Sequence, residues 1–576
     1  MNVTLRGLTY LRPYLRLALG AFVSMLVVTA ANLYAPQLVR QLIDNGIEAG
    51  SWNGILIATG GLLLVAIVRG LFSFTNVYWS ETASQGIAYD LRNEIYTKLE
   101  TLSFSYHDTH RTGQLMTRTT SDVEGVRNFY AQGLLQLISA VLTFIGSMII
   151  LFTTDWRLAL ASLTTIPVII GLFVWLFSRM GPLFGTVQRN LGILNNILQE
   201  SIAGVRVVKA FAAEPRELGR YTDQNEVLYN QNLSVIRMFS LGFPTVFLLA
   251  NIGTLIVIWY GGNLVISEEL SLGTLIAFNS YLAFLLQPIF QLGFLSQQLA
   301  RADASGKRLF EVIDAENEIQ SPAQPIPFAA DAPAGVVFEN VHFSYAGSEK
   351  EILHNISFEV LPGETIALVG ATGSGKSSIV NLIPRFYEAT DGKVLIDGID
   401  VRDFEVNELR HRVGVALQSI SLVSESIKDN IRYGKPEATD EEVIHAAKLA
   451  QAHDFIMEQP DRYETMLGEQ GSGLSGGQRQ RIAIARVLLV HPRILIFDDS
   501  MSAVDVETEH KLQEALEPYL DHHTAFIIAQ RVSTLRSADK ILVIDEGRVA
   551  AEGTHDELMH NSHLYAEIVH SQMDDD

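Results

Sequence analysis

A glycine-rich stretch, GATGSGKSS at residues 370–378, decides the fold of the second half of this 576-residue chain. It fits the pattern G-x-x-x-x-G-K-[ST] and lies between the apolar run TIALVG (365–370) and a helix-like segment, which is the context that the pattern requires. Gly370, Gly373 and Gly375 allow the backbone to wrap around a phosphate with its N–H groups pointing inward. A glycine-rich turn with an incidental lysine is the alternative interpretation, which the complete pattern in this context disfavours.

The residues around this loop carry the predicted nucleotide chemistry. Lys376 would reach the outer phosphates of a nucleotide, and Ser377 would ligate Mg²⁺. The run ILIFDD (494–499) predicts a buried strand that ends in two adjacent carboxylates, Asp498 and Asp499. Asp498 would complete the magnesium site, directly or through water, whereas the alternative is a core strand that ends in a solvated acidic turn. The loop residues expected to contact the nucleotide are Gly370, Thr372, Gly373, Ser374, Gly375, Lys376, Ser377 and Ser378.

Apolar stretches in the first half of the chain predict membrane-spanning helices. Hydrophobic residues make up 48% of the chain and the mean hydropathy is +0.20, so part of the chain is expected to lie in lipid. A helix needs roughly 20 apolar residues to cross a bilayer. The predicted spans are 17–37, 55–79, 133–153, 158–179, 240–265 and 272–296.

The second half of the chain has the pattern of an α/β domain. Short apolar runs, of which KVLIDG (393–398) and KILVID (540–545) are further examples, alternate with helix-like stretches and predict a largely parallel sheet. Residues 316–335 contain four prolines, a composition typical of a linker. We therefore expect a membrane domain at 1–315, a linker, and a nucleotide-binding domain at 336–576.

The charge distribution predicts the orientation in the membrane. Two long connections, 80–132 and 180–239, carry Arg and Lys, whereas the short link between the fifth and sixth spans carries Glu268 and Glu269 with no Lys or Arg. The positive-inside rule places the basic connections, and with them both termini, in the cytoplasm. The formal net charge of -22 argues against a surface that binds nucleic acid. The chain has no cysteine, which excludes disulfides and thiol ligands.

Several polar side chains lie within the predicted spans. Arg69 lies in the second span, where a charge is costly and often functional. The alternative, which we favour, is that Arg69 faces a cavity near the cytoplasmic end or pairs with its partner helix. Another set either lines a cavity or forms hydrogen bonds between helices: Asn251, Asn279, Tyr281, Gln287 and Gln291.

The segment LSGGQRQRIAIAR (474–486) resembles the signature motif of ATP-binding cassette (ABC) proteins. The other motifs of that family follow in order. Tyr345 is placed like the aromatic residue that stacks on adenine, and Gln418 resembles the glutamine that senses Mg²⁺ and contacts the membrane domain. GEQGSG (468–473) resembles the loop before the signature, and SAVD (502–505) resembles the loop that crosses the dimer.

The resemblance to ABC proteins extends over nearly the whole chain. The cassette match covers 336–570, and the first half is similar to the six-helix domain of type IV ABC exporters, with 106–123 and 200–214 resembling its two cytoplasmic loops. This resemblance implies a half-transporter, with a six-helix transmembrane domain followed by an α/β P-loop ABC domain, that uses ATP and Mg²⁺ as cofactors. The signature residues that it implies in the ATP site of a partner subunit are Ser475, Gly476, Gly477 and Gln478.

Two positions depart from the family pattern. The family usually has a glutamate at Asp499, which orients or deprotonates the attacking water, and aspartate is one methylene shorter. The carboxylate is thereby retracted by about 1.5 Å, and a misplacement of order 1 Å can cost about a hundredfold in rate. Gln530 stands where the family has a histidine, and glutamine cannot carry a proton charge. The two departures indicate an impaired ATP site, with conservative drift and retained activity as the alternative.

The resemblance and the two departures together imply a heterodimer. The partner would carry the glutamate and the histidine, and this chain's signature motif would complete the partner's active site. We expect an ATP-driven exporter of lipophilic or amphipathic substrates, such as drugs, lipids or peptides, in a bacterial plasma (inner) membrane. Two alternatives stay open: an ATP-binding regulatory or structural subunit with little hydrolysis, and an importer built on an exporter-like fold.

Overall fold

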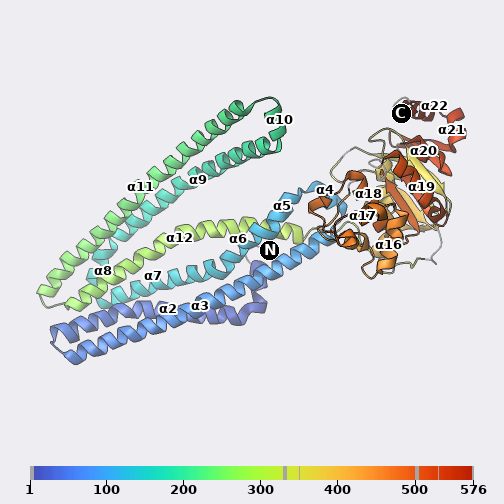
Figure 1. The fold of residues 1–576 in the computed structure, drawn as a ribbon. Coiled ribbons are helices and arrows are strands. Elements are labelled where there is room, and N and C mark those ends of the chain that lie inside the picture. Colours follow the sequence, from blue (N-terminus) through green and yellow to red (C-terminus); the bar gives the residue numbers. More distant parts are fainter. Residues whose placement is uncertain are drawn as a thin grey trace. The chain divides into compact units, whose positions relative to one another are not determined.

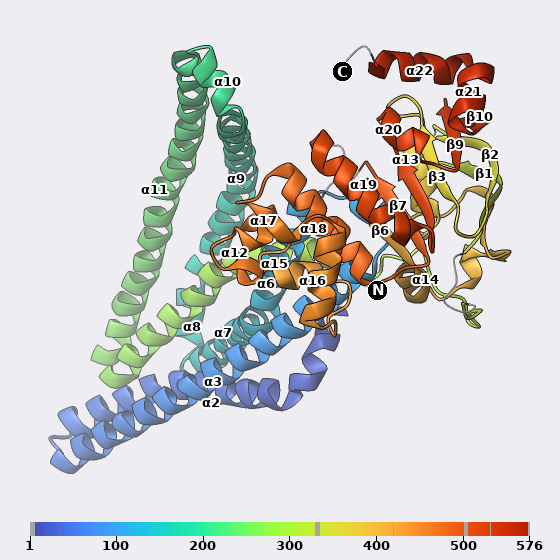
Figure 2. The same cartoon turned by 45° about the vertical axis from the view of Figure 1, so that its right-hand side comes forward.

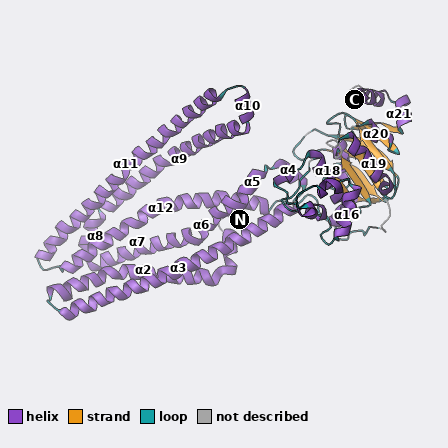
Figure 3. Ribbon diagram, in the orientation of Figure 1, coloured by secondary structure: helices purple, strands orange, loops and turns teal. Residues whose placement is uncertain are grey.

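The computed structural model describes residues 6–328, 334–348, 350–418, 420–499, 505–529 and 531–573 (Figure 1). The chain divides into two compact units. The helical unit comprises Met1–Leu99 and Gly113–Asp314, and the α/β unit comprises Glu100–Thr112 and Ala315–Asp576. Among the described residues, every strand lies in the α/β unit (Figure 3).

Six helices among the described residues are long and apolar enough to cross a membrane, as the sequence predicts. Each contains one of the predicted spans, except that the third helix begins one residue after the predicted start at 133. The helices that carry the spans extend over Thr9–Glu48, Trp52–Thr101, Leu134–Thr154, Trp156–Ala203, Glu214–Ile266 and Leu272–Ile313.

The elements of the helical unit include short π-helical and 3-10 segments between the long helices. In chain order they are η1 (Leu8–Tyr14), α2 (Leu15–Gln41), η2 (Leu42–Glu48), α3 (Trp52–Thr101), α5 (Thr112–Thr117), η3 (Arg118–Asp122), α6 (Val123–Asn128), η4 (Phe129–Gly133), α7 (Leu134–Thr154), α8 (Trp156–Leu163), α9 (Thr165–Ala203), α10 (Val205–Ala210), α11 (Glu214–Ile266) and α12 (Leu272–Ile313). The last residues of α3 and the first of α5 belong to the α/β unit.

The two long basic connections are mostly helical rather than open loops. Helices α3, α9 and α11 continue well beyond the predicted spans, and Figures 1 and 2 show α9 and α11 side by side with α10 at their joined end. Ion pairs link the charged extensions: Arg92 to Glu124 at 2.8 Å, and Arg220 to Glu200 at 2.8 Å. Hydropathy falls where the chain leaves the lipid, but the helical backbone continues with charged faces, so hydropathy alone underestimates the helix lengths.

Polar side chains within the spans pair with neighbouring backbone or side chains. Arg69 of α3 donates a hydrogen bond to Asn32 Oδ1 of α2 at 3.3 Å. The Tyr281 hydroxyl donates to the Leu33 carbonyl of α2 at 2.6 Å, and Asn251 donates to the backbone of its own helix. Arg69 therefore pairs with a neighbouring helix, and Tyr281 forms a hydrogen bond between helices.

The α/β unit contains two sheets. One is antiparallel with the order β2-β1-β4-β5, and the other has the order β10-β9-β3-β8-β7-β6. In the second sheet all neighbouring strands are parallel except the edge strand β10. The strands are β1 (Val336–Phe343), β2 (Leu353–Val360), β3 (Thr365–Val369), β4 (Asp391–Ile396), β5 (Ile399–Asp400), β6 (Val413–Ala416), β7 (Ile494–Asp498), β8 (Thr524–Ile528), β9 (Lys540–Asp545) and β10 (Arg548–Gly553). The predicted parallel sheet is confirmed.

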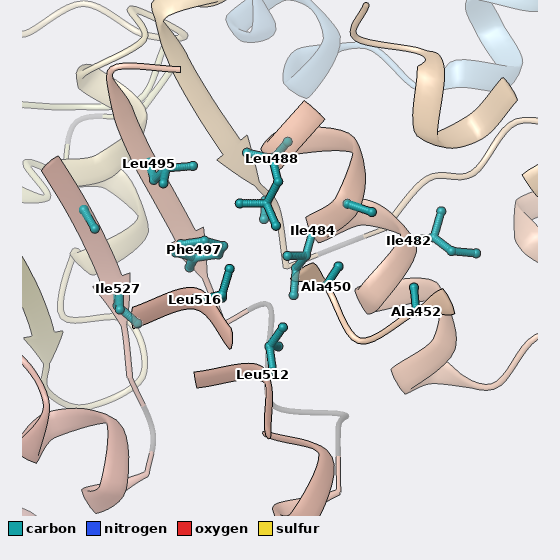
Figure 4. Close-up of a cluster of buried hydrophobic side chains, with 14 of the residues drawn as sticks. Ala450, Ala452, Ile482, Ile484, Leu488, Leu495, Phe497, Leu512, Leu516 and Ile527 are labelled. Carbon is teal, nitrogen blue, oxygen red and sulfur yellow. The ribbon is translucent and has the colours of Figure 1, made fainter. Parts of the chain in front are cut away.

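Helices pack on the parallel sheet and bury its central strands. All residues of β7 and β8 are buried, as expected for parallel strands covered on both faces. Figure 4 shows Phe497 of β7 beside Leu488 of α18 and Leu516 of α19 in one apolar cluster. The helices of this unit are α4 (Phe104–Thr109), α13 (Lys376–Leu382), α14 (Val406–Arg412), α15 (Ile427–Arg432), α16 (Asp440–Leu449), α17 (His453–Met457), α18 (Gly476–Leu489), α19 (Val506–Leu520), α20 (Val532–Arg536), α21 (His555–Asn561) and α22 (His563–Met573), with short 3-10 turns at Val401–Asp403, Arg462–Glu464 and Glu469–Gly471.

The described part of the proline-rich segment, residues 316–328, packs against the α/β unit. The Ile326 amide donates to the Asp403 carbonyl at 2.9 Å, and the Phe328 ring stacks on Phe404 with ring centres 4.0 Å apart. Residues 329–333 lie outside the described part of the chain. A linker composition therefore does not prevent this stretch from making specific contacts.

Candidate nucleotide-binding site

The glycine-rich loop joins β3 to α13 through backbone conformations that require glycine. Gly370 has φ +153°, and a Cβ there would lie 2.1 Å from the Ile544 carbonyl oxygen. Gly375 has φ +106°, and a Cβ there would lie 2.6 Å from the Leu353 side chain. Thr372 is exposed on the loop. The pattern found in the sequence thus corresponds to a tight turn that larger residues would break.

Lys376 folds back over this loop. Its Nζ donates hydrogen bonds to the carbonyl oxygens of Gly370 at 2.9 Å and Ala371 at 2.8 Å, and it lies 3.4 Å from Ser374 Oγ. Burial lowers the pKa of Lys376, although the carboxylate of Asp498 opposes the shift. The ammonium group is therefore the cation of the loop, in the position that suits phosphate oxygens.

Ser377 and Asp498 meet where the sequence predicts a magnesium site. The Ser377 hydroxyl donates to Asp498 Oδ1 at 3.1 Å, which joins the start of α13 to the end of β7. Asp498 is 6% exposed, and burial raises its pKa against the opposing hydrogen bond from Ser377. Hydroxyl and carboxylate oxygens are ligands that Mg²⁺ accepts, and a nearby cation would relieve the cost of the buried charge. The residues present therefore fit this ion.

Gln418 reaches the second aspartate directly. Its Nε2 donates to Asp499 Oδ2 at 3.2 Å. Asp499 has φ +48°, a left-handed conformation that aspartate tolerates better than most residues. The structure thus brings together three of the residues that the sequence assigns to hydrolysis and metal binding: Asp498, Asp499 and Gln418.

The structure leaves one of the predicted catalytic residues untested. Gln530 lies outside the described residues. The preceding residue, Ala529, donates its amide to the Leu368 carbonyl of β3 at 3.2 Å, and the following one, Arg531, forms an ion pair with the buried Glu509 of α19. The assignment of Gln530 to the γ-phosphate stays a prediction.

Tyr345 lies at the edge of the phosphate loop. Its hydroxyl and Ser378 Oγ are 2.9 Å apart in a hydrogen bond. Ser378 is buried, so its hydroxyl positions the Tyr345 ring and faces away from solvent. Both residues are predicted to contact the nucleotide, and the structure joins them to each other by this hydrogen bond.

The signature motif forms the start of α18. The Ser475 side chain accepts a hydrogen bond from the Gln478 amide at 3.3 Å, and Gln478 Oε1 accepts one from the Ser475 amide at 2.9 Å. This reciprocal capping box fixes the first turn of the helix, where Gly476 and Gly477 add no side chain. Both side-chain bonds stay within the motif.

Sequence reasoning missed two residues near Tyr345. Tyr387 lies edge-on to the Tyr345 ring, and its hydroxyl donates to Asp108 Oδ2 at 2.6 Å. The two bonded residues are 279 positions apart. Two residues so far apart carry no sequence pattern that predicts their contact. The adjacent aromatic residues Phe386 and Tyr387, which follow the phosphate-loop helix, were the local feature that could have indicated a contact surface.

The chain matches two family descriptions in the order that the motifs predict. "ABC transporter transmembrane region" matches residues 18–289, and "ABC transporter" matches residues 353–502. The first lies mostly in the helical unit and the second in the α/β unit, where it includes the phosphate loop, the signature motif and both aspartates.

Similar proteins cover almost the whole chain. An uncharacterized ABC transporter ATP-binding protein of Bacillus subtilis, YknU, is 38% identical over 98% of this chain and 97% of its own length. The putative multidrug export ATP-binding/permease protein YgaD of the same species is 36% identical over 99% of both chains. A putative multidrug export ATP-binding/permease protein of Staphylococcus aureus, SAOUHSC_02003, is 36% identical over 98% of both.

A solved structure shares the fold. The structure of a bacterial Atm1-family ABC exporter with ATP bound superposes with a TM-score of 0.80 at 28% identity, over 96% of this chain and 97% of that one. The six apolar helices, the parallel sheet with its phosphate loop, and the relatives matched over nearly their whole length all point to the same family. The chain therefore belongs to the ABC transporter family: it is a multi-pass membrane protein with the fold of an ABC exporter, and its ABC domain is an ATPase coupled to transport.

Proposed function

We propose that this chain is one subunit of a heterodimeric exporter, that its own ATP site is slow, and that its signature motif completes a faster site on the partner. The exporter moves lipophilic or amphipathic substrates out across the plasma (inner) membrane, with both termini and the ABC domain in the cytoplasm. Two relatives named for multidrug export support the direction and the class of cargo. The Atm1-family structure with ATP bound supports the nucleotide.

The residues of the site divide the work of ATP binding. The loop amides and Lys376 would hold the phosphates, while Ser377 and Asp498 would hold Mg²⁺. Bound Mg²⁺ neutralises negative charge on the phosphate oxygens. Gln418 and Asp499 would position the attacking water, because their hydrogen bond places both beside Asp498. Tyr345 would stack on the adenine base.

The position of Asp499 is the observation that carries the proposal. Its carboxylate follows the magnesium aspartate directly and accepts a hydrogen bond from Gln418 at 3.2 Å. A side chain one methylene shorter than glutamate, with its backbone in the left-handed region, reaches less far toward a water at the γ-phosphate. We infer that this site hydrolyses ATP slowly and retains it for long periods.

The helical unit presents an apolar surface that suggests a second subunit. Around α10, at the joined end of α9 and α11, apolar side chains lie exposed among basic residues: Ile202 is 65% exposed, Val207 61%, Phe211 80% and Leu218 66%. The predicted orientation puts this end in the cytoplasm, where lipid does not cover it. A partner subunit is the occupant that fits, because an ABC transporter with one transmembrane region and one ABC region needs a second copy of each.

Two cavities in the helical unit support an amphipathic cargo. One, of about 480 Å³, is lined by apolar residues of α7, α9 and α12, including Phe144, Phe173 and Ile289. The other, of about 910 Å³, is lined by more polar side chains, among them Gln298 and Arg301 of α12. A substrate with an apolar body and a polar group has matching surfaces in this unit.

The test is ATP hydrolysis by this chain purified alone and by the chain co-expressed with the ABC chain encoded beside it. We expect little hydrolysis alone and rapid hydrolysis in the complex. In the complex, Ser475→Arg should abolish rapid hydrolysis, because the bulky side chain blocks the partner's ATP, whereas Asp499→Ala should change it less than about twofold.

Other outcomes distinguish the alternatives. Rapid hydrolysis by the chain alone would show a competent homodimer and contradict the heterodimer. Slow hydrolysis in both samples would favour a regulatory subunit. Uptake of a fluorescent lipid by vesicles with the ABC domain outside is expected for an exporter, and uptake only in the opposite orientation would show an importer.

A further inference from the structure

A continuous series of contacts runs from the phosphate loop to helix α4. This helix, Phe104–Thr109, follows α3 in the chain and belongs to the α/β unit. The Tyr345 hydroxyl is hydrogen-bonded to Ser378 of α13 at 2.9 Å. The Tyr345 and Tyr387 rings meet edge to face, with centres 5.1 Å apart and planes at 87°. The Tyr387 hydroxyl then donates to Asp108 of α4 at 2.6 Å.

Tyr387 links the two ends of this series, because it contacts both Tyr345 and Asp108. Its ring also lies 6.1 Å from Phe104, which packs more closely on Phe386 at 4.7 Å. Burial, together with the bond to Asp108, raises the pKa of Tyr387, so its hydroxyl stays a donor at any physiological pH. The ring contacts of Phe104 and the directional hydrogen bond from Tyr387 to the Asp108 carboxylate therefore help to hold helix α4.

We propose that Tyr387 is a positioning residue that transmits the binding of the adenine base to α4. This inference rests on the proposed function, because it takes Tyr345 as the residue that stacks on adenine. When the Tyr345 ring turns to meet a planar base, its edge contact with Tyr387 changes, and the Tyr387 hydroxyl moves relative to Asp108. A short hydrogen bond to a carboxylate is sensitive to such a movement.

The series starts at Ser378 and Tyr345, the residue assigned to the adenine base, and does not include the residues assigned to the outer phosphates and Mg²⁺. Lys376 bonds to the loop and Ser377 bonds to Asp498, whereas the bond between Tyr345 and Ser378 leads to Tyr387. The phosphate half of the site would thus support hydrolysis, and the base half would support the response of the first cytoplasmic segment. A substitution at Tyr387 should therefore weaken the response of the first cytoplasmic segment without removing nucleotide binding or hydrolysis.

Because the chain contains no cysteine, a single cysteine introduced next to α4 can be labelled selectively in it. Arg111 is exposed two residues after the end of α4, and Arg111→Cys provides one thiol for a nitroxide. The experiment records the electron paramagnetic resonance spectrum of the labelled full transporter, with its partner subunit, with and without saturating Mg–AMP-PNP. The matched control is Tyr463→Phe, which removes a tyrosine hydroxyl bonded to His453 at 2.9 Å in the same unit.

We expect the spectrum of the labelled parent, and of Tyr463→Phe, to change on binding of Mg–AMP-PNP. Tyr387→Phe should bind Mg–AMP-PNP with a Kd within about threefold of the parent, yet lose at least about half of the spectral change. Asp108→Asn keeps an acceptor oxygen and should retain the change, whereas Asp108→Leu should lose it.

Two results would overturn the proposal: a full spectral change in Tyr387→Phe, or no change in a parent that binds Mg–AMP-PNP. Equal loss in Tyr463→Phe would also overturn it, because the effect would then not be specific to this series. Failure of the parent to bind Mg–AMP-PNP would instead contradict the assignment of the nucleotide site itself.

Discussion

Asp499 is the residue on which the proposed catalytic asymmetry rests, and its carboxylate accepts a hydrogen bond from Gln418. We predict that Asp499→Glu speeds hydrolysis at this chain's own site. The expected gain is about tenfold, below the hundredfold that a misplacement of order 1 Å can cost, because Gln530 departs from the family pattern as well. The measurement uses the Ser475→Arg complex, in which only this site remains. Asp499→Asn in the same background is the control and should give no gain.

The buried carboxylate of Asp498 destabilises the folded protein when it is charged, and a bound cation would offset this effect. Burial raises its pKa, so the folded state disfavours the charged form, and stability falls as the pH rises through that raised pKa. We predict that Asp498→Asn raises Tm at pH 8 without nucleotide, less so at pH 5, and loses the stabilisation by Mg–AMP-PNP. Differential scanning fluorimetry from pH 5 to 8 measures both effects. A lower Tm at pH 8 would contradict the cause assigned to the shift.

At the scale of single elements, α16, α18 and α21 among the described helices each begin with a capping box. Ser475 and Gln478 cap α18, and Thr439 and Glu442 cap α16. We predict that Ser475→Ala and Thr439→Ala each lower the free energy of unfolding by about 1 kcal/mol, because each leaves a backbone N–H unpaired. Only Ser475→Ala should also slow ATP hydrolysis by the complex. Urea unfolding and ATPase assays on the same preparations separate stability from function, and an equal loss of activity in both variants would refute a special role for Ser475.

The elements also show how far the sequence predicts the structure. The phosphate loop and the two aspartates were predictable because each is a local motif that directly follows a strand. The parallel sheet was predictable because short apolar runs alternate with helix-like stretches. The lengths of α3, α9 and α11 were not, because hydropathy marks only where a helix lies in lipid. The contact of Tyr387 with Asp108 was also not predictable, since two residues 279 positions apart carry no local pattern.

At the scale of the whole molecule, the exposed apolar surface around α10 bears on assembly with a second subunit. We predict that Phe211→Asp prevents formation of the two-subunit complex, because it puts a charge on a side chain that is 80% exposed in the chain alone and would be buried by the partner. Native mass spectrometry of the co-expressed chains measures the loss. Leu361→Asp, at an exposed apolar residue of the α/β unit, is the control. A complex of normal abundance in Phe211→Asp would place the interface elsewhere.

Helix α3 has a mechanical consequence for the transporter. Its 50 residues contain no proline, whereas α2, α9, α11 and α12 each contain at least one. At a rise of 1.5 Å per residue, α3 is about 75 Å long, and a tilt of about 5° at one end displaces the other by roughly 6 Å. The proline-containing helices have places to bend, but α3 has none at a proline, so a small rotation at its Thr101 end becomes a displacement of several ångströms at its Trp52 end.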